Sequence, residues 1–216
     1  MLEISSLTKR LGKRNVITNL SFSAQRQECI GLFGESGAGK TTLLNVISGL
    51  ASPSAGHVTV EGFDTQAHPL QARRALGYQL QDGLSHQTMS VKGVLNFIAA
   101  VRGFSGAEKR SRVDRAAMRL ELSRVLDAPI DTLSVGLKRR VAIAQAILHT
   151  PGLLLLDEPI EGLATDQLLK FKTLIQSLTE DMTVLIASRH CDNLSSLCTR
   201  ALVIAAGHLV ADTPLP

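Results

Sequence analysis

The sequence predicts an α/β fold with a helical insert. Three short apolar runs have the length and composition of strands that are covered by helices on both faces of a sheet. These runs lie at 29–33, 153–156 and 184–187. Between the first and the second run, from Val91 to His149, apolar residues recur at helical spacing. Alternating strands and helices indicate an α/β core, and the helical stretch indicates an insert within it.

The length of 216 residues fits one domain. We expect a single unit over 1–216, whose α/β core combines 1–82 with 151–216. The helical insert is expected at 83–150.

Short strands and turns surround one helix in the first third of the chain. This helix is expected from Lys40 to Ser48, closed by Gly49, because glycine commonly ends helices. Pro53 and Gly56 indicate a turn. Strands are expected at 2–7, 15–24, 29–33 and 57–61.

Helices dominate the middle of the chain, and the last third returns to alternation. Helices are expected at 91–102, 107–124 and 137–149, the last one ending before Pro151. After it come strands at 153–156, 184–187 and 202–205, with a helix at 167–178 between the first two.

Composition excludes several classes of protein. The net charge of +4 is too weak to argue for a nucleic-acid partner, and none is expected. Three cysteines without metal-site spacing favour a reducing compartment. No apolar stretch approaches the roughly 20 residues of a membrane helix. We therefore expect a soluble, cytoplasmic chain, which leaves docking onto a membrane protein open.

The most specific motif is GESGAGKTT, which fits G-x-x-x-x-G-K-[ST] and lies between a predicted strand and a predicted helix. Its glycines let successive backbone N–H groups face phosphate oxygens, and the following helix offers its positive end. Lys40 can reach the β- and γ-phosphates, and the Thr41 hydroxyl can bind Mg²⁺. The alternative is a glycine-rich turn without a ligand. The predicted ligand is Mg-ATP, bound by Gly34, Glu35, Ser36, Gly37, Ala38, Gly39, Lys40, Thr41 and Thr42.

A second motif, LLLLDEP, ends an apolar strand in two carboxylates. Asp157 is a candidate ligand for Mg²⁺, and Glu158 is a candidate base for an attacking water. Taken alone, the pair is equally compatible with an ordinary acidic end of a strand. Together with Lys40 it predicts a nucleoside triphosphatase.

These motifs, in this order, resemble the ATP-binding subunit of an ABC transporter over essentially the whole chain. Further matching stretches are Gln81 in YQLQ, LSVGLKRR at 133–140, PIEGLA at 159–164, TVLIASRH at 183–190 and VIAAGHLV at 203–210. The resemblance implies a P-loop NTPase core of the RecA-like type, with an antiparallel β edge and an inserted helical subdomain. It also implies that Gln81 links the metal site to the insert.

The resemblance further implies partners. In this family two ATPase domains pair head to tail, so Ser134 and Gly136 would contact the γ-phosphate held by the other domain. The resemblance is compatible with both a homodimer and a heterodimer. The phrase SRHCDNLSSLCTR is most similar to ATPases of small drug, haem and gliding-type exporters. In these the membrane-spanning permease is a separate chain, which implies a peripheral location on the inner face of the cell membrane.

Two departures from the family pattern affect binding. Leu11 stands where an aromatic residue usually stacks on adenine, and it offers no π-face. Phe22 and Phe33 are alternatives, although both are more typical of core packing. In the stretch LSVGL, Val135 replaces a glycine, and a β-branched residue tolerates positive φ poorly. Leu137 removes an amide side chain.

Two further departures affect catalysis. Ala164 stands where the family has an aspartate, and Asp166 is expected instead to cap the next helix. In the ungapped register Arg189 occupies the position of the family's switch histidine, with His190 one residue late. Arg189 would bring a permanent charge to the γ-phosphate, whereas a one-residue bulge would restore His190.

The sequence thus predicts an ATPase that powers a transporter, with slow or asymmetric hydrolysis. Glu158, Gln81 and Arg189 or His190 are its catalytic candidates. The alternatives are a soluble ABC protein without a membrane partner, and a regulatory subunit that binds ATP with little turnover. The cargo and its direction of travel are outside what this chain encodes.

Overall fold

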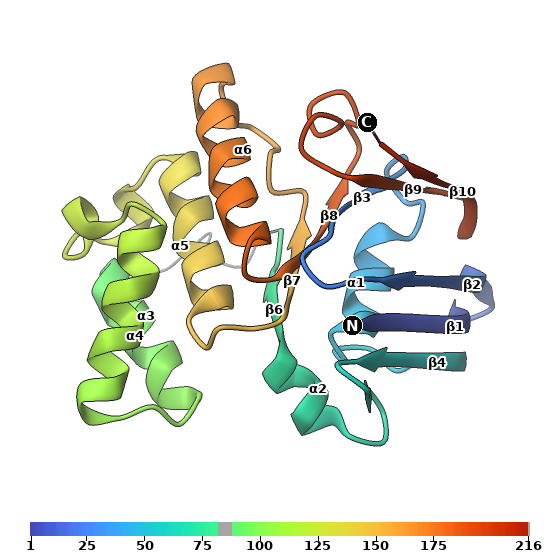
Figure 1. Cartoon of the computed structure of the whole chain (residues 1–216), viewed down its shortest axis with the longest axis horizontal. Helices are drawn as coiled ribbons and strands as arrows, with labels where there is room; N and C mark the ends of the chain where they lie inside the picture. The colour runs from blue at the N-terminus through green and yellow to red at the C-terminus, as the bar shows by residue number, and fades with distance from the viewer. Residues whose placement is uncertain (82–87, 216) are drawn as a thin grey trace.

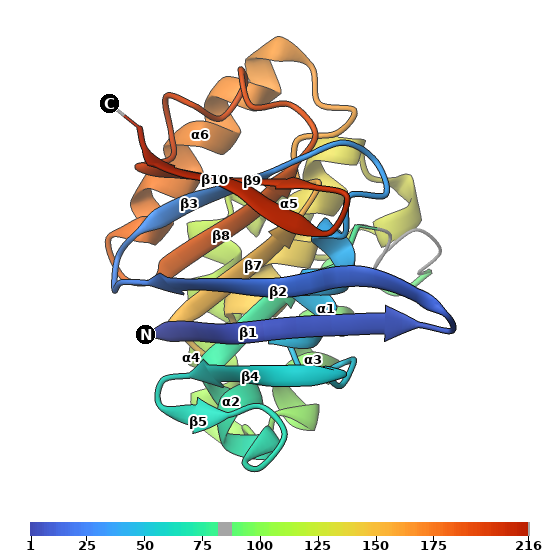
Figure 2. The same cartoon turned by 90° about the vertical axis from the view of Figure 1, so that its right-hand side faces the viewer.

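The computed structural model describes residues 1–81 and 88–215, and its strands form two sheets (Figures 1 and 2). The first sheet is antiparallel and has the strand order β2-β1-β4-β5. Its strands are β1 (Leu2–Leu11), β2 (Arg14–Ala24), β4 (Ala55–Val60) and β5 (Phe63–Asp64).

The second sheet is mostly parallel and has the order β10-β9-β3-β8-β7-β6. Only β10 runs antiparallel to its neighbour. The strands are β3 (Cys29–Phe33), β6 (Leu76–Gln79), β7 (Leu153–Asp157), β8 (Thr183–Ser188), β9 (Arg200–Ala205) and β10 (His208–Pro214).

Helices cover both faces of the second sheet. Helix α1 packs between the two sheets, whereas α3, α4, α5 and α6 pack on the opposite face, away from the antiparallel sheet (Figure 1). The α-helices are α1 (Lys40–Ile47), α2 (Pro69–Ala75), α3 (Val91–Val101), α4 (Gly106–Arg119), α5 (Val135–Ile147) and α6 (Thr165–Thr179). Short 3₁₀ turns lie at Ser123–Val125 and Ile130–Thr132.

Strand β7 shows why the sheet needs cover on both faces. Leu153 and Leu155 point into the core around α1, and Leu154 and Leu156 point into the core formed with the insert helices and α6. All four are fully buried. The side chains of a strand alternate between its faces, so an unbroken apolar run supplies both cores at once.

The predicted strands 29–33, 153–156 and 184–187 are confirmed as β3, β7 and β8, and the predicted helices as α1, α3, α4, α5 and α6, with shifted ends. Helix α5 starts at Val135, two residues earlier than expected, because the Ser134 side chain caps it. Val135 therefore has helical dihedrals and is not strained. The prediction that Asp166 caps α6 is wrong, since the N-cap is Ala164.

The topology places four chain segments at one edge of the second sheet. Strands β6, β7, β8 and β3 are parallel neighbours, so their carboxyl ends meet there. In open α/β sheets ligands bind outside the carboxyl ends of the strands. The segments that leave this edge are the ones that carry the predicted site.

Candidate functional site

The loop after β3 curls tightly around the start of α1. Gly39 caps α1 with φ 110°, and a Cβ there would lie 2.8 Å from the carbonyl oxygen of Val16. At Gly34 a Cβ would lie 2.3 Å from the carbonyl oxygen of Ile204. Both positions require glycine for these reasons. The first N–H groups of α1 are thereby left facing the space in front of the loop, which suits an anion.

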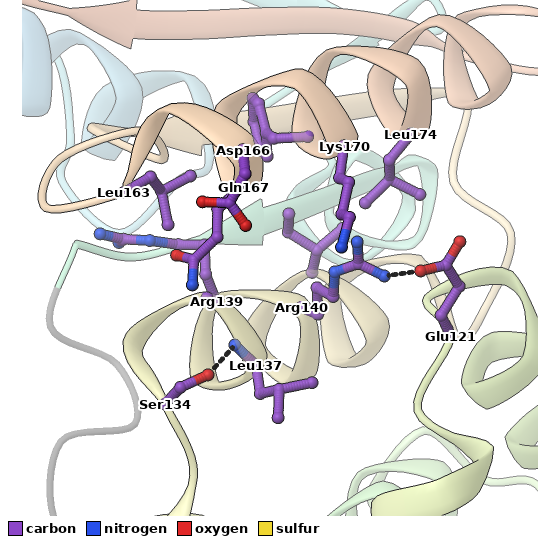
Figure 3. A pocket seen from close by; sticks show the side chains of 13 residues that line it. Glu121, Ser134, Leu137, Arg139, Arg140, Leu163, Asp166, Gln167, Lys170 and Leu174 are labelled. Atoms are coloured by element: carbon purple, nitrogen blue, oxygen red, sulfur yellow. Dashed lines mark hydrogen bonds and ion pairs between the residues drawn. The ribbon is translucent and has the colours of Figure 1, made fainter.

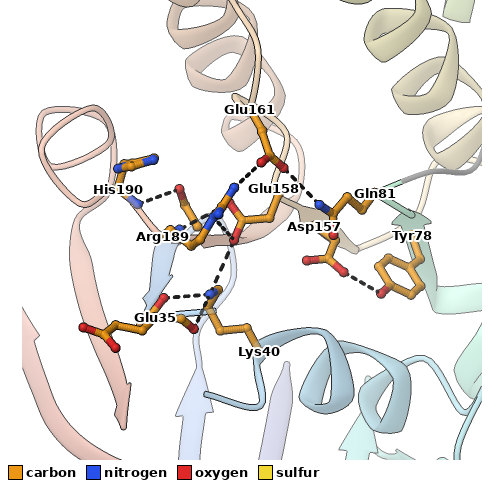
Figure 4. A network of polar contacts seen from close by, with 11 residues as sticks. Glu35, Lys40, Tyr78, Gln81, Asp157, Glu158, Glu161, Arg189 and His190 are labelled. Atoms are coloured by element: carbon orange, nitrogen blue, oxygen red, sulfur yellow. Dashed lines mark hydrogen bonds and ion pairs between the residues drawn. The ribbon is translucent and has the colours of Figure 1, made fainter. Parts of the chain in front are cut away.

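Lys40 lies inside this curl and is 6% exposed. Its Nζ donates to the carbonyl oxygens of Gly34 at 2.7 Å and Glu35 at 3.1 Å. The same Nζ lies 3.4 Å from Oε1 of Glu158 (Figure 4). The loop and the strand β7 thus meet through one buried ammonium group.

Asp157 ends β7 and is 1% exposed. Its Oδ2 accepts a hydrogen bond from the Tyr78 hydroxyl at 3.4 Å, while the buried Oδ1 has no partner among the described residues. Burial raises the pKa of the Asp157 carboxyl, an effect that the Thr41 hydroxyl opposes. A buried carboxylate oxygen without a partner beside a hydroxyl is a donor set that fits Mg²⁺, which prefers oxygen ligands.

Glu158 follows with φ 45°, an uncommon conformation for a residue with a side chain. Its N–H donates to the carbonyl oxygen of Ala187 at 2.9 Å, which ties the turn to β8. Its carboxylate is 8% exposed and faces the backbone N–H of Arg189 at 3.2 Å as well as Lys40. The turn therefore directs this carboxylate into the space in front of the loop.

Of the two switch candidates, the structure brings only Arg189 to this space. The Arg189 Nε lies 3.9 Å from Oε1 of Glu158, and its Nη2 pairs with Glu161. His190 donates its backbone N–H to Ser188 at 3.1 Å, and its side chain points away from Glu158 (Figure 4).

Gln81 reaches the same space from the end of β6. Its Nε2 donates to Oε2 of Glu161 at 2.9 Å. Arg139 on α5 donates to the carbonyl oxygens of Gln81, at 3.3 Å, and of Glu161, at 3.2 Å. Glu161 was not predicted from the sequence as a site residue, because Gln81 and Arg189, the partners of its side chain, are distant in the chain.

Several of these groups surround a cleft of about 350 Å³, and Asp157 is not among the residues that line it. Val16, which the sequence did not indicate, is its apolar wall. Leu11 does not line it and is 55% exposed. Phe22 and Phe33 are buried in the cores and supply no stacking surface. The lining residues are Val16, Ser36, Gly37, Gly39, Lys40, Thr41, Thr42, Gln81, Glu158, Glu161 and Arg189.

Ser134 and Gly136 lie elsewhere, in a second hollow of about 250 Å³ between α5 and α6 (Figure 3). Ser134 Oγ accepts from the N–H of Leu137 at 3.4 Å. A Cβ at Gly136 would lie 3.0 Å from Oε1 of Gln167. Within one chain, the structure does not bring these two residues to the cleft that Lys40 lines.

The fold and the cleft define an ABC-type nucleotide-binding domain, and comparisons with known proteins agree. A sequence model of the family described as ABC transporter matches residues 17–161. This chain belongs to the ABC transporter family, of which it is an ATP-binding domain with the P-loop NTPase fold. Among the described residues, no helix is long and apolar enough to cross a membrane.

Relatives and solved structures match over nearly the whole chain. The ABC transporter ATP-binding protein NatA of Bacillus subtilis is 30% identical, over 97% of this chain and 88% of NatA. The Nod factor export ATP-binding protein I of Ralstonia nicotianae is 31% identical, over 98% of this chain and 66% of that protein. The structure of cbiO1 from Clostridium perfringens, part of the ABC transporter complex cbiONQ, has 25% identity and a TM-score of 0.88, covering 99% of this chain and 88% of cbiO1.

Proposed function

We propose that this chain hydrolyses ATP with Mg²⁺ and that the reaction powers a membrane exporter. The observation that carries the proposal is that Lys40 and Glu158 meet at one cleft at the carboxyl edge of the sheet, with the buried Asp157 beside Thr41, which also lines that cleft. A triphosphatase needs a cationic phosphate cradle, a metal-binding carboxylate and a group that accepts a proton from water. Here Asp157 and Glu158 come from the end of β7, and Lys40 comes from the start of α1, after the loop that follows β3.

Each residue has a defined part in this reaction. The amides at the start of α1 bind phosphate oxygens, and Lys40 exchanges its loop carbonyl partners for the β- and γ-phosphates. Glu158 accepts a proton from the water that attacks the γ-phosphorus, while the bond to the ADP oxygen breaks. Arg189 offers a permanent positive charge to the γ-phosphate. Its charge does not titrate near neutral pH, unlike that of a histidine.

Thr41, Asp157 and Gln81 are the residues that would hold Mg²⁺. The buried Oδ1 of Asp157 has no hydrogen-bond partner among the described residues, and a bound Mg²⁺ would satisfy this oxygen. When bound, Mg²⁺ neutralises charge on the phosphoryl oxygens. Gln81 also connects the cleft with α5 through Arg139.

The proposal includes a second ATPase domain. Ser134 and Gly136 lie at the start of α5, where free N–H groups and a serine hydroxyl suit a phosphate, yet they are apart from the cleft of their own chain. In a head-to-tail pair they would close the cleft of the other domain. The altered positions Val135, Leu137 and Ala164 lie at that surface, so binding of ATP is expected to be better preserved than fast turnover.

A separate permease is the second proposed partner, and a mainly apolar groove on the surface supports it. Leu80, Ile98 and Val101 form its apolar part, and Leu80 and Val101 are exposed. Two buried atoms at the groove, Oε1 of Gln79 and Nε2 of Gln145, have no partner among the described residues. A helix end offers both the apolar side chains and the backbone groups that would satisfy them.

From the resemblance, the helical insert and the segment after Gln81 are expected to form this contact, with Leu84, Met89, Val94, Phe97 and Ile98 as the candidates. Met89 and Phe97 are exposed, but Val94 is buried and is not available to a partner. Leu84 lies outside the described residues. An export role is favoured by the names of the relatives, among them a Nod factor export protein, and it implies a peripheral location at the inner face of the membrane.

Nucleotide binding and hydrolysis by purified protein test the catalytic part. We expect Glu158→Gln to lower ATP turnover by at least about a hundredfold while a fluorescent ATP analogue still binds. Lys40→Ala should lose both. Glu108→Gln, which removes an exposed carboxylate on α4, is the control and should change neither. Undiminished hydrolysis by Glu158→Gln would refute the assignment of the base.

The ATP turnover of the homodimer tests whether the surface that carries Val135, Leu137 and Ala164 still supports hydrolysis in the paired domain. We expect a rate well below the roughly 10 s⁻¹ typical of enzymes. The regulatory alternative is distinguished in cells: if Glu158→Gln behaves like deletion of the gene, hydrolysis is required. If it behaves like wild type, ATP binding alone is the function. Co-purification from membranes with a chain of about six spanning segments would establish the permease.

A further inference from the structure

Glu161 has no role in the sequence patterns that define the site, yet its side chain lines the cleft. It lies in the turn after β7, where its N–H donates to the carbonyl oxygen of Glu158 at 3.3 Å. Gly162 follows with φ 76°, which favours glycine. The turn therefore brings the carboxylate of Glu161 back towards the carboxylate of Glu158.

Both carboxylate oxygens of Glu161 are engaged by segments that are distant in the sequence (Figure 4). Oε1 pairs with Nη2 of Arg189 at the end of β8, and Oε2 accepts from Nε2 of Gln81 at the end of β6. Arg139 additionally binds the carbonyl oxygen of Glu161. Glu161 is thus the common partner of two side chains that flank Glu158.

Arg189 lies between two carboxylates of different exposure. Glu161 is 41% exposed, whereas Glu158 is 8% exposed and lies 3.9 Å from Nε of Arg189. If the charge of Glu161 were removed, Glu158 would be the one carboxylate left beside the guanidinium among the residues that the structure describes. Arginine forms short, two-pronged pairs with carboxylates, and such a pair would occupy the oxygens that accept a proton.

We infer, on the basis of the hydrolytic function proposed above, that Glu161 is a positioning residue. It holds the guanidinium of Arg189 and the amide of Gln81 at the rim of the cleft, so that Arg189 faces the phosphate and Glu158 keeps a free edge for water. The ion pair is half-exposed and contributes little to stability. Its effect is therefore expected in the rate of the chemical step.

The Glu161→Gln variant tests this with the size of the side chain kept. We expect kcat for ATP to fall about tenfold and KM to stay within about twofold, because the change weakens the chemical step more than binding. Glu108→Gln is the matched control, since it removes the carboxylate from the Arg112 pair on α4, at 3.0 Å. An unchanged or higher kcat in Glu161→Gln overturns the inference.

A double variant separates positioning from a general structural role. If Glu161 acts through Arg189, then Glu161→Gln combined with Arg189→Gln should be no slower than Arg189→Gln alone. Losses that multiply would show that Glu161 acts independently of Arg189, and would overturn the inference.

The nucleotide-free protein supplies a readout that does not depend on turnover. With ¹⁵N-labelled arginine, the Nε–H resonance of Arg189, assigned through Arg189→Gln, should shift in Glu161→Gln and stay in place in Glu108→Gln. No shift contradicts the contact. Hydrolysis that survives Glu158→Gln refutes the proposed function itself, whereas a rate that depends on Glu158 but not on Glu161 refutes only this inference.

Discussion

Leu11 lies outside the lining of the cleft, but it belongs to the hairpin that leads to the lining residue Val16, so it tests whether an aromatic side chain on this hairpin can contact the base of ATP. It lies at the end of β1, 55% exposed, and pairs with Arg14 in the hairpin that leads to Val16. An aromatic ring adds about 1 kcal/mol of stacking beyond its buried area. We therefore predict that Leu11→Tyr tightens ATP binding about fivefold, measured with a fluorescent ATP analogue.

Leu70→Tyr is the control for that variant. Leu70 is also exposed, at 67%, but it lies on α2 and not on the hairpin that leads to Val16. Its substitution should leave ATP affinity unchanged. Equal effects of the two variants would mean that Leu11 does not meet the base.

His149 makes stability depend on pH. Its Nε2 contacts the carbonyl oxygen of Leu76 at 3.0 Å, and its buried Nδ1 has no partner among the described residues. Burial, helped by the charges of Arg102 and Arg112, lowers the pKa of His149 to about 4. The unfolded chain has a pKa near 6.5, so it binds a proton first. Stability is full above that value and falls as the pH drops from 6.5 towards 4.

We predict that the free energy of unfolding falls by about 1 kcal/mol between pH 7.5 and 5.5 because of this one ring. Urea unfolding at both pH values measures it. His149→Gln keeps a polar side chain but cannot titrate, so its stability should change less over the same interval. Equal changes in both proteins would exclude His149 as the cause.

At this scale the sequence predicted the residues whose roles are local. Asp157 ends β7, Glu158 follows it, and Lys40 begins α1 after the loop that leaves β3, so each stands in a motif that can be recognised from neighbouring residues in the chain. Glu161 and Val16 were missed because their importance depends on contacts with distant segments. Glu161 contacts Gln81 and Arg189 only because β6 and β8 lie on either side of β7 in the folded sheet.

Among the elements, the start of α5 combines a structural and a proposed chemical role. Ser134 caps α5 through the N–H of Leu137, and Ser90 caps α3 in the same manner through the N–H of Gly93 at 3.1 Å. Losing such a cap costs about 1 kcal/mol. We predict that Ser134→Ala and Ser90→Ala destabilise the fold similarly, and that only Ser134→Ala lowers ATP turnover.

Thermal unfolding and ATPase assays of both variants check this prediction, and Ser134→Thr should retain the cap. If Ser90→Ala lowers turnover as much as Ser134→Ala does, the loss reflects stability alone. If neither variant does so, the Ser134 hydroxyl has no part in catalysis.

Element by element, the predictable parts are those with a strong local pattern. The fully buried β3, β7 and β8 are continuous apolar runs. Strand β6 was not predicted, since LGYQ is short and contains a glycine and the buried Gln79. It is a strand because it pairs in parallel with β7. Helix α2 was missed for a related reason, because it buries only Ala72.

At the level of the whole molecule, the cleft and the hollow that Ser134 lines are two separate sites on the same domain. The cleft belongs to the carboxyl edge of the second sheet, and the hollow belongs to α5 and α6. Each chain thus carries two separate halves of the proposed site. A two-fold pair uses the same surface patch on both chains, so it completes two sites at once.

This symmetry makes a mixing experiment decisive. Lys40→Ala destroys the cleft, and Ser134→Arg blocks the hollow with a bulky charge, so each variant alone forms no intact site. In an equimolar mixture, random pairing gives about half mixed dimers, each with one intact site out of two. If each site works independently, we predict ATP turnover of about a quarter of wild type in the mixture, measured after dissociation and reassociation. Turnover no higher than that of the separate variants would mean that one chain hydrolyses ATP without a contribution from the other.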